Sequence, residues 1–322
     1  MKLLVTVPWD AAEFASVTAR FPDITFCAAL TPEKVITEVA DAEVVLGDFS
    51  REVFLAAKQL RWVQCHGAGV NKLVEIPELM DSDVQITSTK GAHAPTIAEH
   101  FFGLLISLAR QFPKLQVAQQ QREWVKWSTW PDRIGDLPLG LQGRTLGILG
   151  LGNIGMAIAE RAQAFGMQVL AVDIRSLPTP PTVTALWTLD ALPELLRQSD
   201  AVVVTLPGTP QTNGLLDVEM LRHMQPSAFL LVVSRGGIVD EAELAAMLHD
   251  KRLAGAALDV AVEEPPAADS PLWSAPNLLL TPHIAGKSAN TTAAATEIFA
   301  TNLARYVAGQ PLINLVDKEL GF

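Results

Sequence analysis

Residues 145–156 read Thr-Leu-Gly-Ile-Leu-Gly-Leu-Gly-Asn-Ile-Gly-Met, and a strand, a turn and a helix are predicted to meet there. Leu146–Leu149 is a short apolar run, typical of a buried parallel strand. Gly150, Gly152 and Gly155 follow in G-x-G-x-x-G order, and Met156–Phe165 is predicted to be helical. In this arrangement the first glycine permits a tight turn, the second lets the backbone approach a pyrophosphate, and the third lets the helix pack closely on the strand.

The glycine pattern alone is a weak signal, since a purely structural turn would also explain it. Its context strengthens it, because a second apolar strand, Gln168–Val172, ends in Asp173. An acidic residue about 20 residues past the glycines can accept hydrogen bonds from the ribose hydroxyls of NAD. Arg175 leaves NADP open, since a 2′-phosphate would be repelled by Asp173 and attracted by Arg175. We expect NAD(H) to be preferred.

Length and composition restrict the class of protein and its partners. The 322 residues suffice for two domains, and 49% apolar with 18% charged residues is typical of a globular protein. A net charge of −11 argues against nucleic acid or an anionic membrane as a partner. The apolar run before Pro8 is too short for a signal peptide, and Cys27 and Cys65 give neither a disulfide framework nor a metal site. We therefore expect a cytoplasmic protein without a metal.

The first 90 residues alternate short apolar strands with helices, which predicts a small parallel sheet covered on both faces. The expected strands are Leu3–Val7, Ile24–Ala28, Glu43–Leu46, Trp62–Cys65 and Val84–Thr87, and the expected helices are Ala11–Arg20, Pro32–Ala40 and Glu52–Ala57. After the fourth strand, residues 65–71 read Cys-His-Gly-Ala-Gly-Val-Asn. Such a loop could present N–H groups to a carboxylate, or it could be a plain turn.

A long helical pattern runs from Ala94 to about Arg122 and is interrupted by Pro113. Beyond it, tryptophans recur every third residue, at Trp124, Trp127 and Trp130. Core packing is the commoner explanation for such residues. A subunit interface or a rim over the site is the alternative, because prolines and glycines flank the segment.

Six strands are expected in the part of the chain that contains the glycine turn, matching a six-stranded doubly wound sheet. After the first two, they are Ala201–Leu206, Phe229–Ser234, Gly255–Val260 and Leu278–Thr281, with helices at Asp190–Gln198, Asp217–His223 and Glu241–His249. A final helix, Ser288–Val307, lies too far along to belong to this sheet. The predicted fold is therefore α/β with two doubly wound parallel-sheet domains. A Rossmann dinucleotide-binding domain, residues 94–286, is inserted into a flavodoxin-like substrate domain, residues 1–93 and 287–322.

Three ionisable residues follow expected strands of the dinucleotide-binding sheet: Arg235, Glu264 and His283. Parallel sheets present groups to ligands at this carboxyl edge. Hydride transfer to a ketone creates an alkoxide, so a proton donor and a cation must stand beside the carbonyl. His283 is the natural donor, Glu264 would favour its imidazolium form, and Arg235 offers a planar fork to a 2-keto carboxylate. Each residue also has a structural explanation: a buried ion pair, a solvated loop position or a strand cap.

These residues lie in motifs that resemble the D-isomer-specific 2-hydroxyacid dehydrogenase family along essentially the whole chain. The motifs are residues 146–155, Ser-Arg-Gly-Gly-Ile-Val-Asp-Glu at 234–241, Leu-Asp-Val at 258–260 with Glu264-Pro265, Pro-Leu-Trp at 271–273, and Thr-Pro-His-Ile-Ala-Gly at 281–286. The resemblance implies that Arg235 orients the substrate and that Glu264 supports His283, the acid/base.

The same resemblance implies further contacts. Asp259 would accept from the nicotinamide carboxamide, and the N–H groups of Ala68 and Gly69 would hold the substrate carboxylate. A helix like Ala94–Arg110 links the domains in the family, and its members are usually homodimers. The complete set of candidate cofactor contacts is Gly150, Gly152, Asn153, Ile154, Gly155, Asp173, Arg175, Leu206, Pro207 and Asp259.

Two positions depart from the family pattern. Val232 stands where the family often has asparagine, three residues before the catalytic arginine, so one contact is missing or replaced. Asn71 stands where an aspartate is common in the carboxylate loop, which changes the local charge without removing the backbone donors.

The predicted function is NAD(P)H-dependent reduction of a small 2-keto acid to the D-2-hydroxy acid, and the reverse oxidation. Glyoxylate, hydroxypyruvate or a short-chain relative is the expected substrate. Formate oxidation is less favoured, because relatives with that activity lack a glutamate at the position of Glu264. The alternative from another class is an NAD(H)-sensing binding protein of the corepressor type on the same fold.

Overall fold

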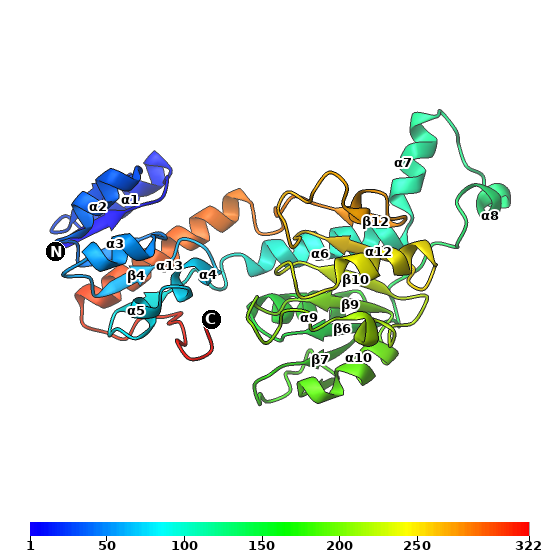
Figure 1. Ribbon diagram of the computed structural model, residues 1–322. Helices are drawn as coiled ribbons and strands as arrows, with labels where there is room; N and C mark the ends of the chain where they lie inside the picture. The colour runs from blue at the N-terminus through cyan, green and yellow to red at the C-terminus, as the bar shows by residue number, and fades with distance from the viewer. Residues whose placement is uncertain (322) are drawn as a thin grey trace. The chain divides into compact units, whose positions relative to one another are not determined.

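The computed structural model describes residues 1–321, apart from the side chain of Asn71. The chain divides into two compact units, the first comprising Met1–His93 with Lys287–Phe322 and the second comprising Ala94–Gly286. Each unit is built on one parallel sheet, of five strands in the first and seven in the second (Figure 1). The predicted pair of doubly wound α/β sheets is confirmed.

The sheet of the first unit has the order β2-β1-β3-β4-β5, and every neighbouring pair is parallel. Its strands are β1 (Lys2–Val5), β2 (Thr25–Ala28), β3 (Val44–Leu46), β4 (Trp62–Gln64) and β5 (Gln85–Thr87). This is the flavodoxin-like order, and the strands are the five that the sequence predicts, each one residue shorter than predicted. The loop at residues 65–70 leaves the carboxyl end of β4.

Helices cover both faces of this sheet because successive strand residues point to opposite sides. Leu4 belongs to a core shared with α2, α3, α4 and α5, whereas Leu3 and Val5 belong to a core shared with α1 and α13. The helices are α1 (Ala11–Arg20), α2 (Pro32–Val39), α3 (Arg51–Ala56), α4 (Asn71–Val74), α5 (Pro77–Met80) and α13 (Ala289–Val307). The last of these begins at the cap Ser288, whose hydroxyl accepts from the N–H of Thr291.

The sheet of the second unit has the order β12-β11-β10-β9-β6-β7-β8, again entirely parallel. Its strands are β6 (Thr145–Leu149), β7 (Gln168–Val172), β8 (Ala185–Trp187), β9 (Ala201–Val204), β10 (Phe229–Val232), β11 (Gly255–Leu258) and β12 (Leu278–Leu280). The chain direction across the sheet reverses between β6 and β9, which is the switch point where doubly wound sheets bind ligands.

The expectation of six strands in this sheet is wrong by one. β8 is only three residues long, lies at the sheet edge, and has half-buried rather than buried residues. It follows a proline-containing loop and has no long apolar run. Its pairing with β7 makes it a strand, and a single sequence does not reveal that pairing.

Helices also cover both faces of the second sheet. α6 (Ala94–Ala109) and α9 (Asn153–Ala164) share a core with Leu146 and Ile148, whereas α10 and α12 share a core with Leu149. The remaining helices are α7 (Phe112–Gln120), α8 (Trp130–Arg133), α10 (Leu192–Gln198), α11 (Val218–Leu221) and α12 (Glu241–His249), with short 3-10 turns at Trp127–Thr129, Leu189–Ala191 and Pro271–Trp273. No helix among the described residues is long and apolar enough to cross a membrane.

The helical pattern predicted from Ala94 to Arg122 is two helices. Gln111 adopts a left-handed backbone with φ +60° and separates α6 from α7, which places Pro113 in the first turn of the new helix. Proline is tolerated there because its missing N–H would have no helical partner. Among the three tryptophans, Trp130 is buried, while Trp124 and Trp127 are exposed. Core packing therefore explains only the last of them.

Candidate active site

The glycine turn joins β6 to α9. Gly150 has φ +94°, and a Cβ atom at Gly155 would lie 2.3 Å from the carbonyl oxygen of Gly150. Glycine is therefore required at both positions, by backbone conformation in one and by helix–strand contact in the other. The helix starts at Asn153, three residues earlier than predicted, so Asn153 and Ile154 lie in its first turn.

Gly152 caps this helix and differs from the other two glycines. It has φ −82°, which any residue adopts, and a Cβ atom there would meet nothing within 4 Å. No side chain caps the helix. The N–H groups of its first turn therefore have no side-chain cap, and an uncapped helix N-terminus is a place where a phosphate can bind.

Asp173 follows β7 and is 4% exposed. Its carboxylate accepts from the N–H of Leu151 at 2.8 Å, and from the N–H, Nε and Nη2 of Arg175 at 2.9, 2.9 and 3.1 Å. Burial opposes its charge, but the hydrogen bonds from Arg175 and Leu151 outweigh burial and lower the pKa of Asp173 below its ordinary value of 3.8. The carboxylate of Asp173 is therefore anionic at neutral pH, and it is paired with Arg175.

Leu206 and Pro207 follow β9, on the other side of the switch point. Leu206 is buried against the glycine turn, since its side chain lies 2.9 Å from where a Cβ atom of Gly150 would be. The carbonyl of Pro207 accepts from the hydroxyl of Thr212 at 2.6 Å. Both residues follow the carboxyl end of β9, and Leu206 contacts the glycine turn.

Arg235 follows β10 and is half-buried, with Nη1 donating to the carbonyl of Ser234 at 2.7 Å. The next residue, Gly236, packs directly on the loop after β11. A Cβ atom on Gly236 would lie 2.0 Å from the carbonyl oxygen of Ala261 and 2.6 Å from the nitrogen of Val262. Only glycine allows this contact, and it holds the loop of Arg235 against the loop that carries Glu264.

Glu264 and His283 are hydrogen-bonded, with Nδ1 of His283 2.7 Å from Oε2 of Glu264. The other oxygen of Glu264 accepts from the N–H of Ala261 at 3.2 Å. Both side chains are partly open to solvent, at 49% of full exposure for His283 and 41% for Glu264. The carboxylate therefore engages one ring nitrogen and leaves Nε2 available for proton transfer.

Glu241, which the sequence reasoning did not single out, supports this loop from the first turn of α12. Its Oε1 accepts from the N–H of Val262 at 2.7 Å. Burial, together with the nearby charges of Asp240 and Glu264, raises the pKa of Glu241 above its ordinary value, although the bond from Val262 opposes that shift. The position of Glu264 thus depends on Gly236 from one side and Glu241 from another.

Asp259 directly follows β11 and is buried. Its Oδ1 accepts from the hydroxyl of Thr281 at 2.6 Å and from the N–H of Ile284 at 3.0 Å, while Oδ2 accepts from the N–H of Ala285 at 2.9 Å. These donors stand on both sides of His283 in the chain. The structure thus gives Asp259 a role in holding that loop, in addition to the carboxamide contact that the family resemblance implies.

His100, on α6, also contacts this group. Its Nε2 lies 3.0 Å from the hydroxyl oxygen of Thr281 and 3.6 Å from Oδ1 of Asp259. His100 and Thr281 are 181 residues apart in the chain, so no local pattern in the sequence connects them. Sequence reasoning treated the first as a helix residue and the second as a strand end.

The loop predicted to bind a carboxylate lies in the first unit. The Cys65 thiol donates to the carbonyl of Gly69 at 3.2 Å, and the carbonyl of Gly67 accepts from the N–H of Thr89 at 3.1 Å. No backbone carbonyl among residues 1–321 accepts from the N–H groups of Ala68 or Gly69. The bonds to the carbonyls of Gly67 and Gly69 hold the loop, and the N–H groups of Ala68 and Gly69 remain available to a ligand. The side chain of Asn71 lies outside the described part of the chain.

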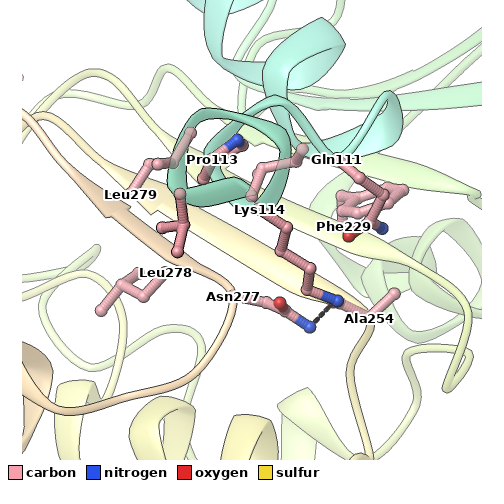
Figure 2. Close-up of a pocket in the computed structure, with 10 residues that line it drawn as sticks. Gln111, Pro113, Lys114, Phe229, Ala254, Asn277, Leu278 and Leu279 are labelled. Carbon is pink, nitrogen blue, oxygen red and sulfur yellow. Dashed lines mark hydrogen bonds between the residues drawn. The ribbon is translucent and has the colours of Figure 1, made fainter. Parts of the chain in front are cut away.

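A cavity of about 200 Å³ lies elsewhere in the second unit (Figure 2). Its lining includes Phe229, Ala254 and Leu278, which stand at the amino ends of β10, β11 and β12, together with Pro113 and Lys114 of α7. Figure 2 shows the Lys114 side chain extending beside Asn277 and Ala254. Because the candidate catalytic residues follow the carboxyl ends of these strands, this cavity lies at the opposite edge and takes no part in the site.

Residues 102–285 match the family described as D-isomer specific 2-hydroxyacid dehydrogenase, NAD binding domain. A glyoxylate reductase of Korarchaeum cryptofilum is 34% identical over 295 residues, which are 89% of this chain and 87% of that relative. A D-3-phosphoglycerate dehydrogenase of Methanocaldococcus jannaschii is 27% identical over 321 residues, 98% of this chain but only 59% of that longer relative.

Solved structures agree with these sequence matches. A D-isomer specific 2-hydroxyacid dehydrogenase from Xanthobacter autotrophicus Py2, in complex with NADPH and MES, superimposes with a TM-score of 0.85 at 30% identity and covers 100% of this chain and 99% of that one. The match to the family extends over more than half of the chain, and the family motifs fall on the residues whose geometry is described above. The chain therefore belongs to the D-isomer specific 2-hydroxyacid dehydrogenases, a family of oxidoreductases.

Proposed function

We propose that this protein catalyses the NAD(P)H-dependent reduction of a small 2-keto acid to its D-2-hydroxy acid, and the reverse oxidation. The observation that carries the proposal is the 2.7 Å hydrogen bond between Nδ1 of His283 and Glu264 at the carboxyl edge of a dinucleotide-binding sheet. Glyoxylate is the first substrate to test, because the relative from Korarchaeum cryptofilum is a glyoxylate reductase. Hydroxypyruvate and short-chain 2-keto acids follow from the same chemistry.

In this proposal His283 is the general acid. Its Nδ1 is engaged by Glu264, which fixes the ring and stabilises the imidazolium, so Nε2 donates the proton to the carbonyl oxygen of the substrate. A bound nicotinamide supplies the hydride. In the reverse direction the neutral imidazole accepts the hydroxyl proton, and Glu264 stabilises the charge that develops on the ring.

Arg235 binds the substrate carboxylate in this proposal. The guanidinium of Arg235 forms charge-assisted bonds with a carboxylate and polarises the neighbouring carbonyl. Considered by itself, the loop at residues 65–70 of the first unit offers two donors that suit a carboxylate, the N–H groups of Ala68 and Gly69, which donate to no backbone carbonyl among the described residues. Donors of this kind offset locally the unfavourable field that a chain with net charge −11 presents to an anion.

Two features of the glycine turn and one of the residue after β7 suit a dinucleotide. The first helical turn after Gly152 has no side-chain cap, the space beside Gly152 is open, and Asp173 is anionic. Asn153, Ile154, Leu206 and Pro207 would line the pyrophosphate and the adjoining ribose, and Asp259 would reach the carboxamide. We favour NAD(H) because the Asp173 anion repels a 2′-phosphate while its bonds already hold the Arg175 guanidinium.

We further propose that residues 1–93 and 287–322 form the substrate domain and residues 94–286 the dinucleotide-binding domain. This division follows the compact units, and the match to the NAD binding domain lies within the second of them. A cytoplasmic location is part of the same proposal and rests on the composition, which includes only two cysteines.

The same proposal includes a homodimer formed through the segment from α7 to α8. Figure 1 shows this segment extending away from the sheet of the second unit. Its exposed apolar side chains are Phe112, Val117, Trp124 and Trp127, and Trp124 is 90% exposed. A surface of this kind is typical of an interface. Sedimentation of the Trp124→Ser, Trp127→Ser double variant should yield monomers where the unmodified protein yields dimers.

The activity is tested by measuring NADH and NADPH oxidation in parallel against a panel of 2-keto acids. We expect turnover of at least one small 2-keto acid and a lower KM for NADH than for NADPH. Tight NADH binding without turnover of any panel member would contradict the proposed reaction and favour a cofactor-sensing role.

A further inference from the structure

We propose that His100 and Thr281 are positioning residues for the reaction. Together with Asp259, they hold loop 281–286 in the conformation that presents the His283 imidazole. The inference rests on the proposed role of His283 as the general acid, and neither residue would touch substrate or cofactor.

The direction of each hydrogen bond follows from what the groups can donate. The Asp259 carboxylate only accepts, so the hydroxyl of Thr281, 2.6 Å away, must direct its single proton to Oδ1. The Thr281 oxygen is then an acceptor for His100, whose Nε2 lies 3.0 Å away and therefore carries a proton. Donation runs from His100 to Thr281 to Asp259.

Asp259 fixes the chain on both sides of His283. Thr281 donates from two residues before it, and the N–H groups of Ile284 and Ala285 donate from the residues after it. The N–H of His283 itself donates to the carbonyl of Asp259 at 2.8 Å. All four bonds end on one buried residue, so moving Asp259 moves the whole loop.

This loop needs restraint because His283 has φ +52°, a left-handed conformation that is unfavourable for a residue with a side chain. Such a conformation persists only where the surroundings over-determine it. The Asp259 side chain is 1% exposed, so water does not replace a lost donor. The Thr281 hydroxyl therefore contributes to the orientation of the imidazole as well as to the local stability.

The hydrogen bonds that Thr281, Ile284 and Ala285 donate to Asp259 are called the clamp below. His100 connects the clamp to helix α6 of the second unit. It lies on α6 between Ala98 and Phe101, which are both fully buried in the core against the sheet. The hydrogen bond from its imidazole therefore fixes the hydroxyl of Thr281 relative to a well-packed helix. A catalytic group held this way keeps its geometry within a few tenths of an ångström, which proton transfer requires.

The test compares conservative and disruptive variants at both positions. Thr281→Ser keeps the hydroxyl and Thr281→Val removes it at nearly constant volume. His100→Gln places an amide N–H where Nε2–H lies, and His100→Leu places no donor there. The control is His249→Leu, which removes an exposed histidine at the last residue of α12. His249 precedes the amino end of β11, whereas Asp259 follows its carboxyl end. Each variant is assayed for kcat and KM with the best keto acid, and for fold by circular dichroism.

We expect kcat to fall roughly 10- to 100-fold in Thr281→Val and His100→Leu, because a misplaced catalytic group loses rate without losing substrate affinity. KM for the keto acid should change little, since Arg235 lies on a different loop. Thr281→Ser and His100→Gln should stay within about threefold of the unmodified enzyme, because each retains the hydrogen bond. The Thr281→Val, His100→Leu double variant should be no slower than Thr281→Val alone, because both changes break one chain of bonds.

A Thr281→Val variant with unchanged kcat, or a His100→Gln variant as slow as His100→Leu, would overturn the inference. Additive losses in the double variant would also overturn it. If the unmodified protein reduced no keto acid, the proposed function would fail separately. Amide hydrogen exchange at Ile284 and Ala285 would then test the clamp alone: Thr281→Val should accelerate it, and unchanged protection would refute the clamp.

Discussion

The glycine turn allows cofactor binding to be separated from folding by two alanine substitutions three residues apart. In Gly155→Ala the new Cβ would lie 2.3 Å from the carbonyl oxygen of Gly150, a distance that real Cβ atoms essentially never show. Only backbone can move to relieve it, so helix α9 and strand β6 must separate by about 1 Å. We expect a loss of about 1 to 3 kcal/mol in the free energy of unfolding, as for other overpacked sites.

Gly152→Ala should behave in the opposite way. The added methyl meets nothing within 4 Å, and φ −82° suits alanine, so the loss of stability should stay below about 1 kcal/mol, the cost of alanine at a helix cap. The same methyl fills the space that a pyrophosphate would occupy. We expect the Kd for NADH to rise at least tenfold, which corresponds to about 1.4 kcal/mol.

Gly103→Ala is the matched control, because Gly103 is exposed in the middle of α6 and its Cβ would also meet nothing. Alanine in a helix interior should stabilise the protein by about 0.5 to 1 kcal/mol and leave NADH binding unchanged. Urea denaturation reports the stabilities, and quenching of tryptophan fluorescence reports the Kd. A Gly152→Ala variant that binds NADH as tightly as Gly103→Ala would refute the assignment of the glycine turn to a phosphate.

Three further predictions concern separate parts of the molecule. Arg235→Lys should raise KM for the keto acid roughly 10-fold and leave the Kd for NADH unchanged, because the lysine ammonium forms one charge-assisted bond fewer with the carboxylate. An unchanged KM would show that Arg235 does not bind the carboxylate. Asp173→Asn should destabilise the protein at neutral pH, because the lowered pKa of Asp173 means that the folded state favours the anion. The difference in unfolding free energy between this variant and the unmodified protein should shrink as the pH falls below 3.8. A difference that stays constant with pH would contradict the cause given for the pKa shift. Asn302→Leu should lower the free energy of unfolding by on the order of 3 kcal/mol, because the N–H and the carbonyl of Ile313 both lose a buried partner. Asn290→Leu, at an exposed position of the same helix, should lower it little, and equal effects of the two changes on thermal unfolding would refute the role of this contact.

Sequence patterns predicted both sheets because the strands are short apolar runs between clear helix signals. The sequence could not show β8, whose three half-buried residues are a strand only through their pairing with β7. It placed the start of α9 three residues late, because a glycine-rich first turn carries no helical periodicity. The exposure of Trp124 and Trp127 was equally hidden, since it depends on the path of an irregular segment.

The candidate catalytic residues were predictable because parallel strands place the residues that follow them at one edge. The observed bond between His283 and Glu264 agrees with that reasoning, although the roles of both residues stay predictions. The supporting contacts were not predictable, since Gly236 on Ala261 and His100 on Thr281 are tertiary contacts between loops and helices distant in the chain. A motif identifies the groups that act, and the packing around them determines how they are held.

The most direct test of the acid/base role is single-turnover reduction of the best keto acid by NADH-saturated His283→Ala. We predict that the rate falls by roughly 10² to 10⁴ while the NADH Kd measured by fluorescence stays unchanged, which is the usual contribution of a positioned proton donor. Glu264→Gln in the same experiment should give a smaller loss. A His283→Ala variant with an undiminished rate, or one whose NADH affinity falls as much as its rate, would contradict the assignment of His283 as the proton donor.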